Sequence, residues 1–74
     1  MDFRKVVGQN VRRARLAKGW TQENLADASG LHRVYINGVE RGRRNITILA
    51  VKRIAGALEL PPAELLIVGC AKRQ

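Results

Sequence analysis

The stretch TQENLADASGLHRVYINGVERGRRN, residues 21–45, predicts two short helices that meet at a glycine and are followed by a basic loop. Apolar residues at helical spacing give each segment one narrow face to bury. These residues are Leu25, Ala26, Ile36 and Val39. Gly30 lies at the break, where a positive φ angle can end the first helix. The pattern predicts a helix-turn-helix over about residues 21–41, which the rest of the chain supports.

Polar and charged residues mark the ends of both helices. Thr21 is a good first cap, because its hydroxyl can accept a hydrogen bond from the free amides of the turn that follows. Arg41, Arg43 and Arg44 fall at or beyond the end of the second helix, where cations meet the negative end of the helix dipole. Three arginines in four residues, with only Glu40 beside them, favour phosphate binding over a plain solvated surface.

The composition indicates a polyanionic partner. The chain has 74 residues, which suffice for a single domain over residues 1–74 with one core. Fourteen Lys and Arg residues against six Asp and Glu give a formal net charge of +8. Nucleic acid and an anionic membrane surface both fit such a charge, and composition alone does not separate them.

A membrane is nevertheless not an expected partner. No segment approaches the length of a bilayer span, and the basic first helix has too narrow an apolar stripe to lie on a bilayer. A single cysteine, Cys70, excludes an internal disulfide and suits a reducing compartment. We therefore expect a soluble, cytoplasmic protein.

No residue pattern indicates a cofactor or a reaction. Cys70 and the one histidine, His32, lie far apart in sequence without metal-ligand spacing. There is no Ser/His/Asp set with recognisable context and no glycine-rich phosphate loop after a strand. We expect no metal, no cofactor, no small-molecule ligand and no enzymatic activity.

The flanking segments predict three further helices and no strand. Asp2 can cap a first helix that extends to about Lys18. The residues expected on its core side are Phe3, Val7, Val11 and Ala14. Trp20 is expected to pack at the hinge after it. Asn45 and Thr47 are capping residues for a fourth helix, and two prolines then precede a short fifth one.

The run after those prolines predicts self-association. It consists of Leu65, Leu66, Ile67 and Val68. Four consecutive apolar residues are too many for one face of a peripheral helix on a small monomer, so we expect them to contact a second subunit. The dimerisation region would cover about residues 60–70.

These residues resemble the Xre/Cro-type helix-turn-helix regulators, the phage-repressor-like DNA-binding domains, over most of the chain. The matching residues are Arg15, Thr21-Gln22-Glu23, Leu25-Ala26, Gly30-Leu31, Tyr35-Ile36, Glu40-Arg41-Gly42, Ile54-Ala55 and Leu58. The segment LHRVYINGVERGRRNIT, residues 31–47, is especially similar to the controller proteins of restriction-modification systems, which are small stand-alone dimers. The resemblance implies an all-α, compact five-helix, phage-repressor-like helix-turn-helix domain.

The resemblance also implies roles for individual residues. A recognition helix from about His32 to Arg41 would lie in the major groove of DNA. The positions facing base edges would be His32, Arg33, Val34, Asn37 and Gly38. Side chains holding phosphates would be Gln22, Tyr35, Arg43, Arg44 and Asn45. Arg15 and Glu40 match a structural ion pair that joins the first helix to the third in this family.

Three positions depart from the family pattern. His32 replaces the usual Ser or Thr cap; it is a weaker cap but a possible donor to phosphate or base. Gly38 lies inside the recognition helix, where it costs about 1 kcal/mol relative to Ala. It either allows close approach to DNA or to Tyr35, or is a tolerated surface glycine. Ile46 stands where many relatives have Pro, which weakens the start of the fourth helix.

The resemblance implies a homodimeric regulator of transcription that binds double-stranded DNA at a palindromic operator, as a restriction-modification controller does. The alternative is a protein-interaction module, such as an antitoxin that binds a partner protein and its own promoter, because such proteins also use this fold. A toxin-binding segment would need additional chain after the fifth helix, where only a short tail follows.

Overall fold

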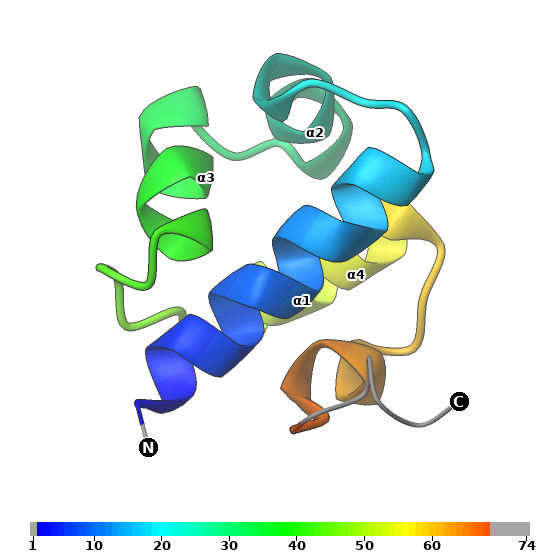
Figure 1. Ribbon diagram of the computed structural model, residues 1–74. Helices are drawn as coiled ribbons and strands as arrows, with labels where there is room; N and C mark the ends of the chain where they lie inside the picture. The colour runs from blue at the N-terminus through cyan, green and yellow to red at the C-terminus, as the bar shows by residue number, and fades with distance from the viewer. Residues whose placement is uncertain (1, 69–74) are drawn as a thin grey trace.

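The computed structural model describes residues 2–68, which form four α-helices and a short 3-10 helix, without a strand in that range (Figure 1). The elements are α1 (Phe3–Ala17), α2 (Gln22–Ser29), α3 (Arg33–Glu40), α4 (Ile48–Leu58) and the 3-10 helix η1 (Pro62–Leu66). The all-helical class predicted from the sequence is therefore confirmed, with four α-helices in place of five.

Side-chain caps explain where the helices begin. Asp2 caps α1 and Thr47 caps α4, each accepting a hydrogen bond from an amide of the first turn at 3.1 and 3.0 Å. At α2, Thr21 and Asn24 form a capping box, in which each side chain accepts from the other residue's backbone N–H. Such caps satisfy amides that have no partner within the helix, and each contributes about 1 kcal/mol.

Two glycines with positive φ set the ends of α2 and α3. Gly30 ends α2 with φ of 77°, as the sequence predicted. Gly42, with φ of 72°, follows α3 in a Schellman motif. In this motif the Arg43 N–H donates to the Gly38 carbonyl at 2.9 Å, and the Gly42 N–H donates to the Val39 carbonyl at 3.0 Å. The basic loop is thereby folded back against the last turn of α3.

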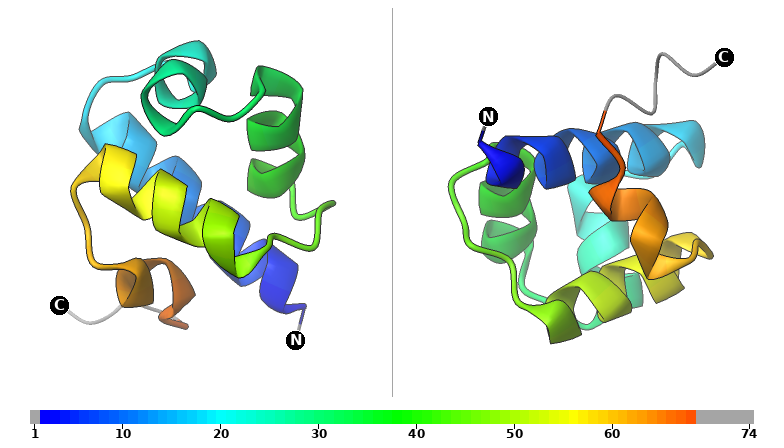
Figure 2. Two further views of the ribbon diagram at one scale, coloured as in Figure 1. Left: turned by 180° about the vertical axis from the view of Figure 1, so that it is seen from behind. Right: turned by 90° about the horizontal axis from the view of Figure 1, so that it is seen from below.

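The elements pack around one core. α1 contacts α3 and η1, α2 contacts α3 and α4, and η1 also contacts α4. Figures 1 and 2 show α1 and α4 crossing in the middle of the molecule, with α2 and α3 on one side of this pair and η1 at the end opposite α2. The largest fully buried side chains are Val7, Val11, Leu25, Ile36, Val39, Ile54 and Leu65. The core therefore holds the inner faces of α2 and α3 and leaves their outer faces exposed.

α1 and α3 meet at Gly8, which is buried. A Cβ atom at this position would collide with the carbonyl oxygens of Val39 and Glu40. Glycine is thus required for the close approach of the two helices. The position of α3 on the molecule depends on this contact.

The predicted fifth helix is a single 3-10 turn. Two prolines at its start supply no amide hydrogen, and the Glu64 N–H donates to the Pro61 carbonyl at 2.9 Å in the i to i+3 pattern. The buried Asn10 side chain of α1 donates to the carbonyls of Leu65 and Ile67, at 2.8 and 3.0 Å. Because these carbonyls are satisfied by α1, the segment is fastened to the core without being an α-helix.

The burial of the apolar run corrects part of the expected dimer contact. Leu65 is fully buried in the core of its own subunit and is not available to a second one. Leu66 and Val68 are 41 % and 51 % exposed, and Ile67 is half-buried. Phe3, expected in the core, is also 47 % exposed. A 3-10 turn presents only one residue in three to the same side, so the run is divided between core and surface.

Residues 2–68 contain neither a candidate membrane-spanning helix nor a candidate metal-binding cluster. Among residues 2–68, no helix is both long and apolar enough to cross a bilayer. In the same range, no three His, Cys, Asp or Glu side chains gather closely enough to hold a metal ion. Cys70 and the end of the expected dimerisation region lie outside the described residues.

Candidate nucleic-acid interface

A buried ion pair joins α1 to α3. Arg15 Nε lies 2.7 Å from Glu40 Oε2 and its Nη2 lies 2.9 Å from Oε1; the two side chains are 9 % and 2 % exposed. Hydrogen bonding to Glu40 raises the pKa of the Arg15 guanidinium above its ordinary value, so the arginine remains charged. Arg15 Nη1 also donates to the Trp20 carbonyl at 2.7 Å. One guanidinium thus connects α1, the hinge before α2 and the end of α3.

The same carboxylate orders two amide side chains of the helix-turn-helix. Gln22 Nε2 donates to Glu40 Oε1 at 3.1 Å, and Asn37 Nδ2 donates to Gln22 Oε1 at 3.2 Å. Because an ionised carboxylate only accepts hydrogen bonds, Gln22 must present its nitrogen to Glu40 and its oxygen to Asn37. The first residue of α2 and the middle of α3 are therefore held in one fixed relation.

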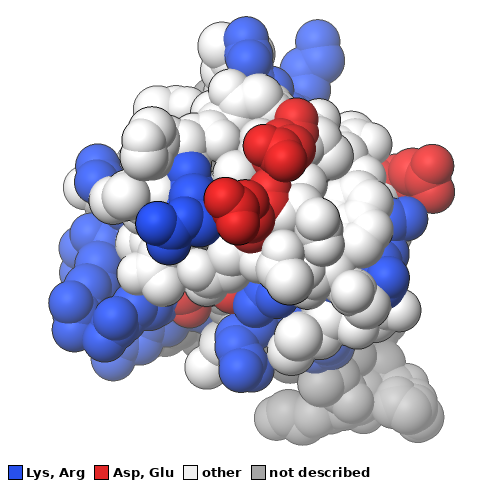
Figure 3. Space-filling view, turned by 90° about the horizontal axis from the view of Figure 1, so that it is seen from above, with Lys and Arg blue, Asp and Glu red and all other residues white. Residues whose placement is uncertain are grey.

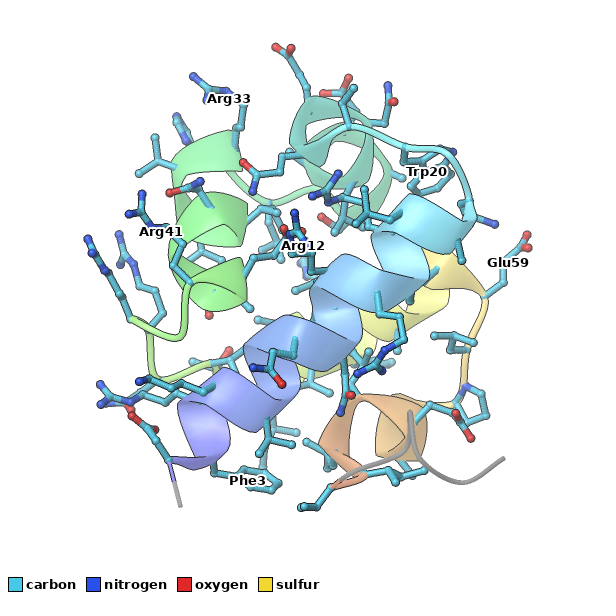
Figure 4. All side chains as sticks on the ribbon, in the orientation of Figure 1. Phe3, Arg12, Trp20, Arg33, Arg41 and Glu59 are labelled. Carbon is cyan, nitrogen blue, oxygen red and sulfur yellow. The ribbon has the colours of Figure 1, made fainter. Side chains whose placement is uncertain are left out.

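The outer face of α3 carries the residues expected to reach base edges. His32, Arg33 and Val34 are exposed, and Asn37 and Gly38 are half-buried. Val34 is an apolar side chain left 54 % exposed, which suits contact with a thymine methyl group. Figure 4 shows Arg33 projecting away from the molecule at the start of α3. The five positions share the surface of one helix, and their contacts with bases stay a prediction.

His32 caps α3 with its imidazole ring. Its Nδ1 accepts from the Val34 N–H at 3.1 Å. In the neutral ring the proton therefore lies on Nε2, which is a hydrogen-bond donor. The histidine thus replaces the cap usual in the family and adds a donor beside Arg33.

The loop after α3 presents cations on the same side of the molecule. Arg43, Arg44 and Asn45, the expected phosphate ligands, are all exposed, as is Arg41. Figure 4 shows Arg33 and Arg41 projecting from opposite ends of α3 toward the same side. Gln22, another expected phosphate ligand, lines a surface depression together with Arg33.

Tyr35 does not have the position expected of a phosphate ligand. Its hydroxyl is buried and makes no hydrogen bond in the described part of the chain. Its ring packs against the core, and Arg44 lies over it with Cζ 5.5 Å from the ring centroid. In this conformation Arg44 covers the tyrosine, so the guanidinium and not the hydroxyl is accessible to a phosphate. The phosphate contact expected for Tyr35 stays a prediction, and it would require Arg44 to move away from the ring.

Charge is unevenly distributed over the surface. In Figure 3, Lys and Arg side chains gather on the side of α3 and the loop after it, whereas acidic side chains lie over α2, which carries Glu23 and Asp27. The excess positive charge is therefore next to the exposed face of α3.

A family model described as helix-turn-helix matches residues 11–65. The chain belongs to this helix-turn-helix family. The matched range includes α2, α3 and the Arg15–Glu40 pair that supports them. The family predicted from the sequence is therefore confirmed.

Several similar proteins are restriction-modification controllers. The chain is 42 % identical over 66 residues to control protein C.SmaI of Serratia marcescens, over 89 % of this chain and 79 % of that protein. The controller protein C.AhdI from Aeromonas hydrophila has a TM-score of 0.82 and 47 % identity, over 84 % of this chain and 94 % of that one. The controller C.Esp1396I, as a tetramer in complex with its natural 35 base-pair operator, has a TM-score of 0.80 and 38 % identity, over 88 % and 86 % of the two chains.

Proposed function

We propose that this protein is a homodimeric, sequence-specific double-stranded-DNA-binding regulator of transcription, and that it is a controller of the restriction-modification type. The observation that carries the proposal is the outer face of α3, where Arg33 and Val34 stand exposed between Gln22 and the arginines of the following loop. An α-helix fits the major groove, and phosphates line both edges of that groove. The function needs no cofactor and no reaction, and it would be performed in the bacterial cytoplasm.

Sequence choice would come from the outer face of α3. The Arg33 guanidinium can donate to O6 and N7 of a guanine, and Val34 can contact a thymine methyl group. Asn37 gives one hydrogen bond to Gln22, which leaves its carbonyl oxygen and second N–H for a base edge. The rigid link to Gln22 holds that amide in place before DNA arrives, which lowers the entropy cost of binding.

Affinity would come from contacts with phosphates on both edges of the groove. Gln22 stands at the start of α2, where unpaired backbone amides attract an anion. Arg43, Arg44 and Asn45 would hold the opposite edge. The net charge of +8 adds a long-range attraction that does not depend on sequence.

The dimer would form through an apolar groove between the ends of α1, α4 and η1. Its lining residues are Phe3, Val7, Ile46, Ile48, Val51, Lys52, Pro62 and Leu66. Ile48 is 89 % exposed, an unfavourable state for an isoleucine that a partner subunit would relieve. Phe3 lies at the end of the molecule opposite Arg33 in Figure 4, so pairing leaves the recognition residues free. Two copies would place their recognition helices about 34 Å apart, one turn of DNA.

Assignment as a controller is supported by the relatives. Both C.SmaI and C.AhdI carry that function in their names, and C.Esp1396I has been found on its operator. The alignments with C.SmaI and C.AhdI cover 89 % and 84 % of this chain.

Binding to the DNA upstream of its own gene tests the proposal. Fluorescence anisotropy should show affinity for that duplex at least about a thousandfold higher than for a scrambled duplex of equal length. Footprinting should show two protected half-sites about one helical turn apart. Equal affinity for both duplexes, or no binding to either, would contradict the proposed function.

A further inference from the structure

Gly38 lies in the middle of α3, beneath the folded-back side chain of Arg44. A Cβ atom at Gly38 would lie 2.8 Å from Arg44 Cγ and 3.1 Å from its Nε. Beyond this point, the guanidinium reaches the ring of Tyr35, with Cζ 5.5 Å from the ring centroid. The stem of Arg44 therefore crosses the helix where the side chain is missing and ends on an aromatic face.

The backbone of the loop is anchored at the same residue. The Arg43 N–H donates to the Gly38 carbonyl at 2.9 Å, and Gly42 provides the left-handed turn that brings the loop back. Arg44 thus starts from a fixed backbone and runs along a fixed path. A guanidinium stacked on an aromatic ring keeps its outward N–H groups free to bind an anion.

We infer that Gly38 and Tyr35 are positioning residues for Arg44: together they hold its guanidinium toward the DNA backbone before binding. The inference rests on the proposed function, because it needs DNA as the anion. It assigns the glycine of α3 to the protein's own arginine and not to close approach of DNA. It also explains why the Tyr35 ring is left beneath a cation with its hydroxyl turned inward.

The two explanations of Gly38 predict different effects of the Gly38→Ala substitution on DNA binding. If Gly38 serves Arg44, then Gly38→Ala displaces Arg44 and its effect on binding disappears once Arg44 is absent. If Gly38 instead allows the DNA to approach, the added methyl obstructs DNA whether or not Arg44 is present. A double-mutant cycle separates these cases.

The stability of the variants is checked in the same experiment, so that weaker binding is not mistaken for loss of folding. Alanine is a better helix former than glycine, so Gly38→Ala should leave the melting temperature unchanged or raise it. Gly56→Ala in α4 is the matched control, because that glycine is exposed and no heavy atom would lie within 4 Å of the new Cβ. Tyr35→Leu removes the aromatic ring over which the Arg44 guanidinium lies.

The experiment compares wild type, Gly38→Ala, Arg44→Ala, the double variant, Tyr35→Leu and Gly56→Ala. Each is titrated with a scrambled duplex at several salt concentrations, and NMR records the Arg44 δ-methylene shifts without DNA. We expect Gly38→Ala to weaken binding by up to about tenfold, Arg44→Ala to do so at least as strongly, and the double variant to match Arg44→Ala. Gly56→Ala should bind as wild type, and Tyr35→Leu should bind as Gly38→Ala.

Without DNA, the upfield shift that the Tyr35 ring imposes on Arg44 should be lost in Gly38→Ala and kept in Gly56→Ala. Unchanged Arg44 shifts and affinity in Gly38→Ala, or additive losses in the double variant, would overturn the inference while leaving the proposed function intact. Wild-type protein that binds neither scrambled nor upstream DNA would overturn the proposed function, and the inference with it.

Discussion

Asn37 on α3 donates its side-chain amide to Gln22 at the start of α2, with Nδ2 3.2 Å from Oε1. The bond joins a residue expected to read a base to a residue expected to hold a phosphate. The other group of the Gln22 side-chain amide, Nε2, donates to Glu40 Oε1 at 3.1 Å, so both ends of this amide are held. We therefore expect orientation on the DNA backbone and recognition of the base sequence to be coupled through these two neighbouring amides.

The first prediction concerns this coupling. Gln22→Ala should weaken binding to operator and scrambled DNA and also narrow the ratio between them, because Asn37 loses the bond that orients it. A double-mutant cycle with Asn37→Ala on the operator should give a coupling free energy of about 0.5 to 3 kcal/mol. Gln9→Ala, an exposed amide on α1, should have no effect on binding. Strictly additive losses would show that the two amides act independently.

The second prediction concerns the buried ion pair. Glu40→Ala leaves the Arg15 guanidinium, only 9 % exposed, without its carboxylate. The free energy of unfolding should fall by roughly 3 to 5 kcal/mol, which lowers the melting temperature of so small a domain by more than about 10 °C. Thermal unfolding followed by circular dichroism measures this.

Glu59→Ala is the control for that measurement. Glu59 also pairs with a cation, Lys18, but at 3.3 Å and with its side chain 79 % exposed. An exposed pair of this kind contributes about 1 kcal/mol at most. Equal, small shifts for both variants would mean that burial gives the Arg15–Glu40 pair no special role.

The third prediction concerns the contact between α1 and α3. In Gly8→Ala the new methyl meets two carbonyl oxygens of α3, which cannot rotate away as a side chain would. We expect a loss of about 1 to 3 kcal/mol in unfolding free energy. Gly56→Ala, where the space is open, should gain up to about 1 kcal/mol from helix propensity. Denaturant unfolding should therefore give opposite signs for the two substitutions, and a gain in both would contradict the observed approach of the helices.

The fourth prediction concerns the apolar groove. Wild-type protein should sediment as a dimer at micromolar concentrations, and Ile48→Asp should be monomeric with an unchanged helical content, because Ile48 contributes little to its own core. Leu16→Asp places the same charge at a 49 % exposed leucine outside the groove and should remain dimeric. A dimer that persists in Ile48→Asp would place the interface elsewhere.

Local signals in the sequence predicted most of the helical framework. Thr21, Gly30 and Thr47 act within one or two turns of their own position, so their roles as caps or terminators can be recognised without a fold. Apolar spacing likewise identified Leu25, Ile36 and Val39 as core residues. The family resemblance added the Arg15–Glu40 contact, which spans 25 positions and has no local signal.

Contacts between elements were not predictable in the same way. Asn10 reaches carbonyls 55 and 57 positions later, and nothing next to it in the chain indicates that use. Gly8 offered a partial signal, because a glycine within an amphipathic helix is costly unless something approaches it closely. Leu65 was misassigned because an apolar run does not reveal which of its members a 3-10 turn directs inward. The burial of the Tyr35 hydroxyl beneath Arg44 was not predicted, because Arg44 comes from the loop after α3 and not from the helix itself.

The central claim is that α3 reads bases while the loop after it holds the backbone, and parallel titrations of Arg33→Ala and Arg43→Ala test it most directly. Each variant is titrated with operator and scrambled duplexes at several salt concentrations. Arg33→Ala should lose about 1 to 3 kcal/mol on the operator and much less on the scrambled duplex. Arg43→Ala should weaken both equally and reduce the slope of log K against log salt by about 0.9. Equal losses on both duplexes for Arg33→Ala would contradict base recognition by this residue and make it a further phosphate ligand.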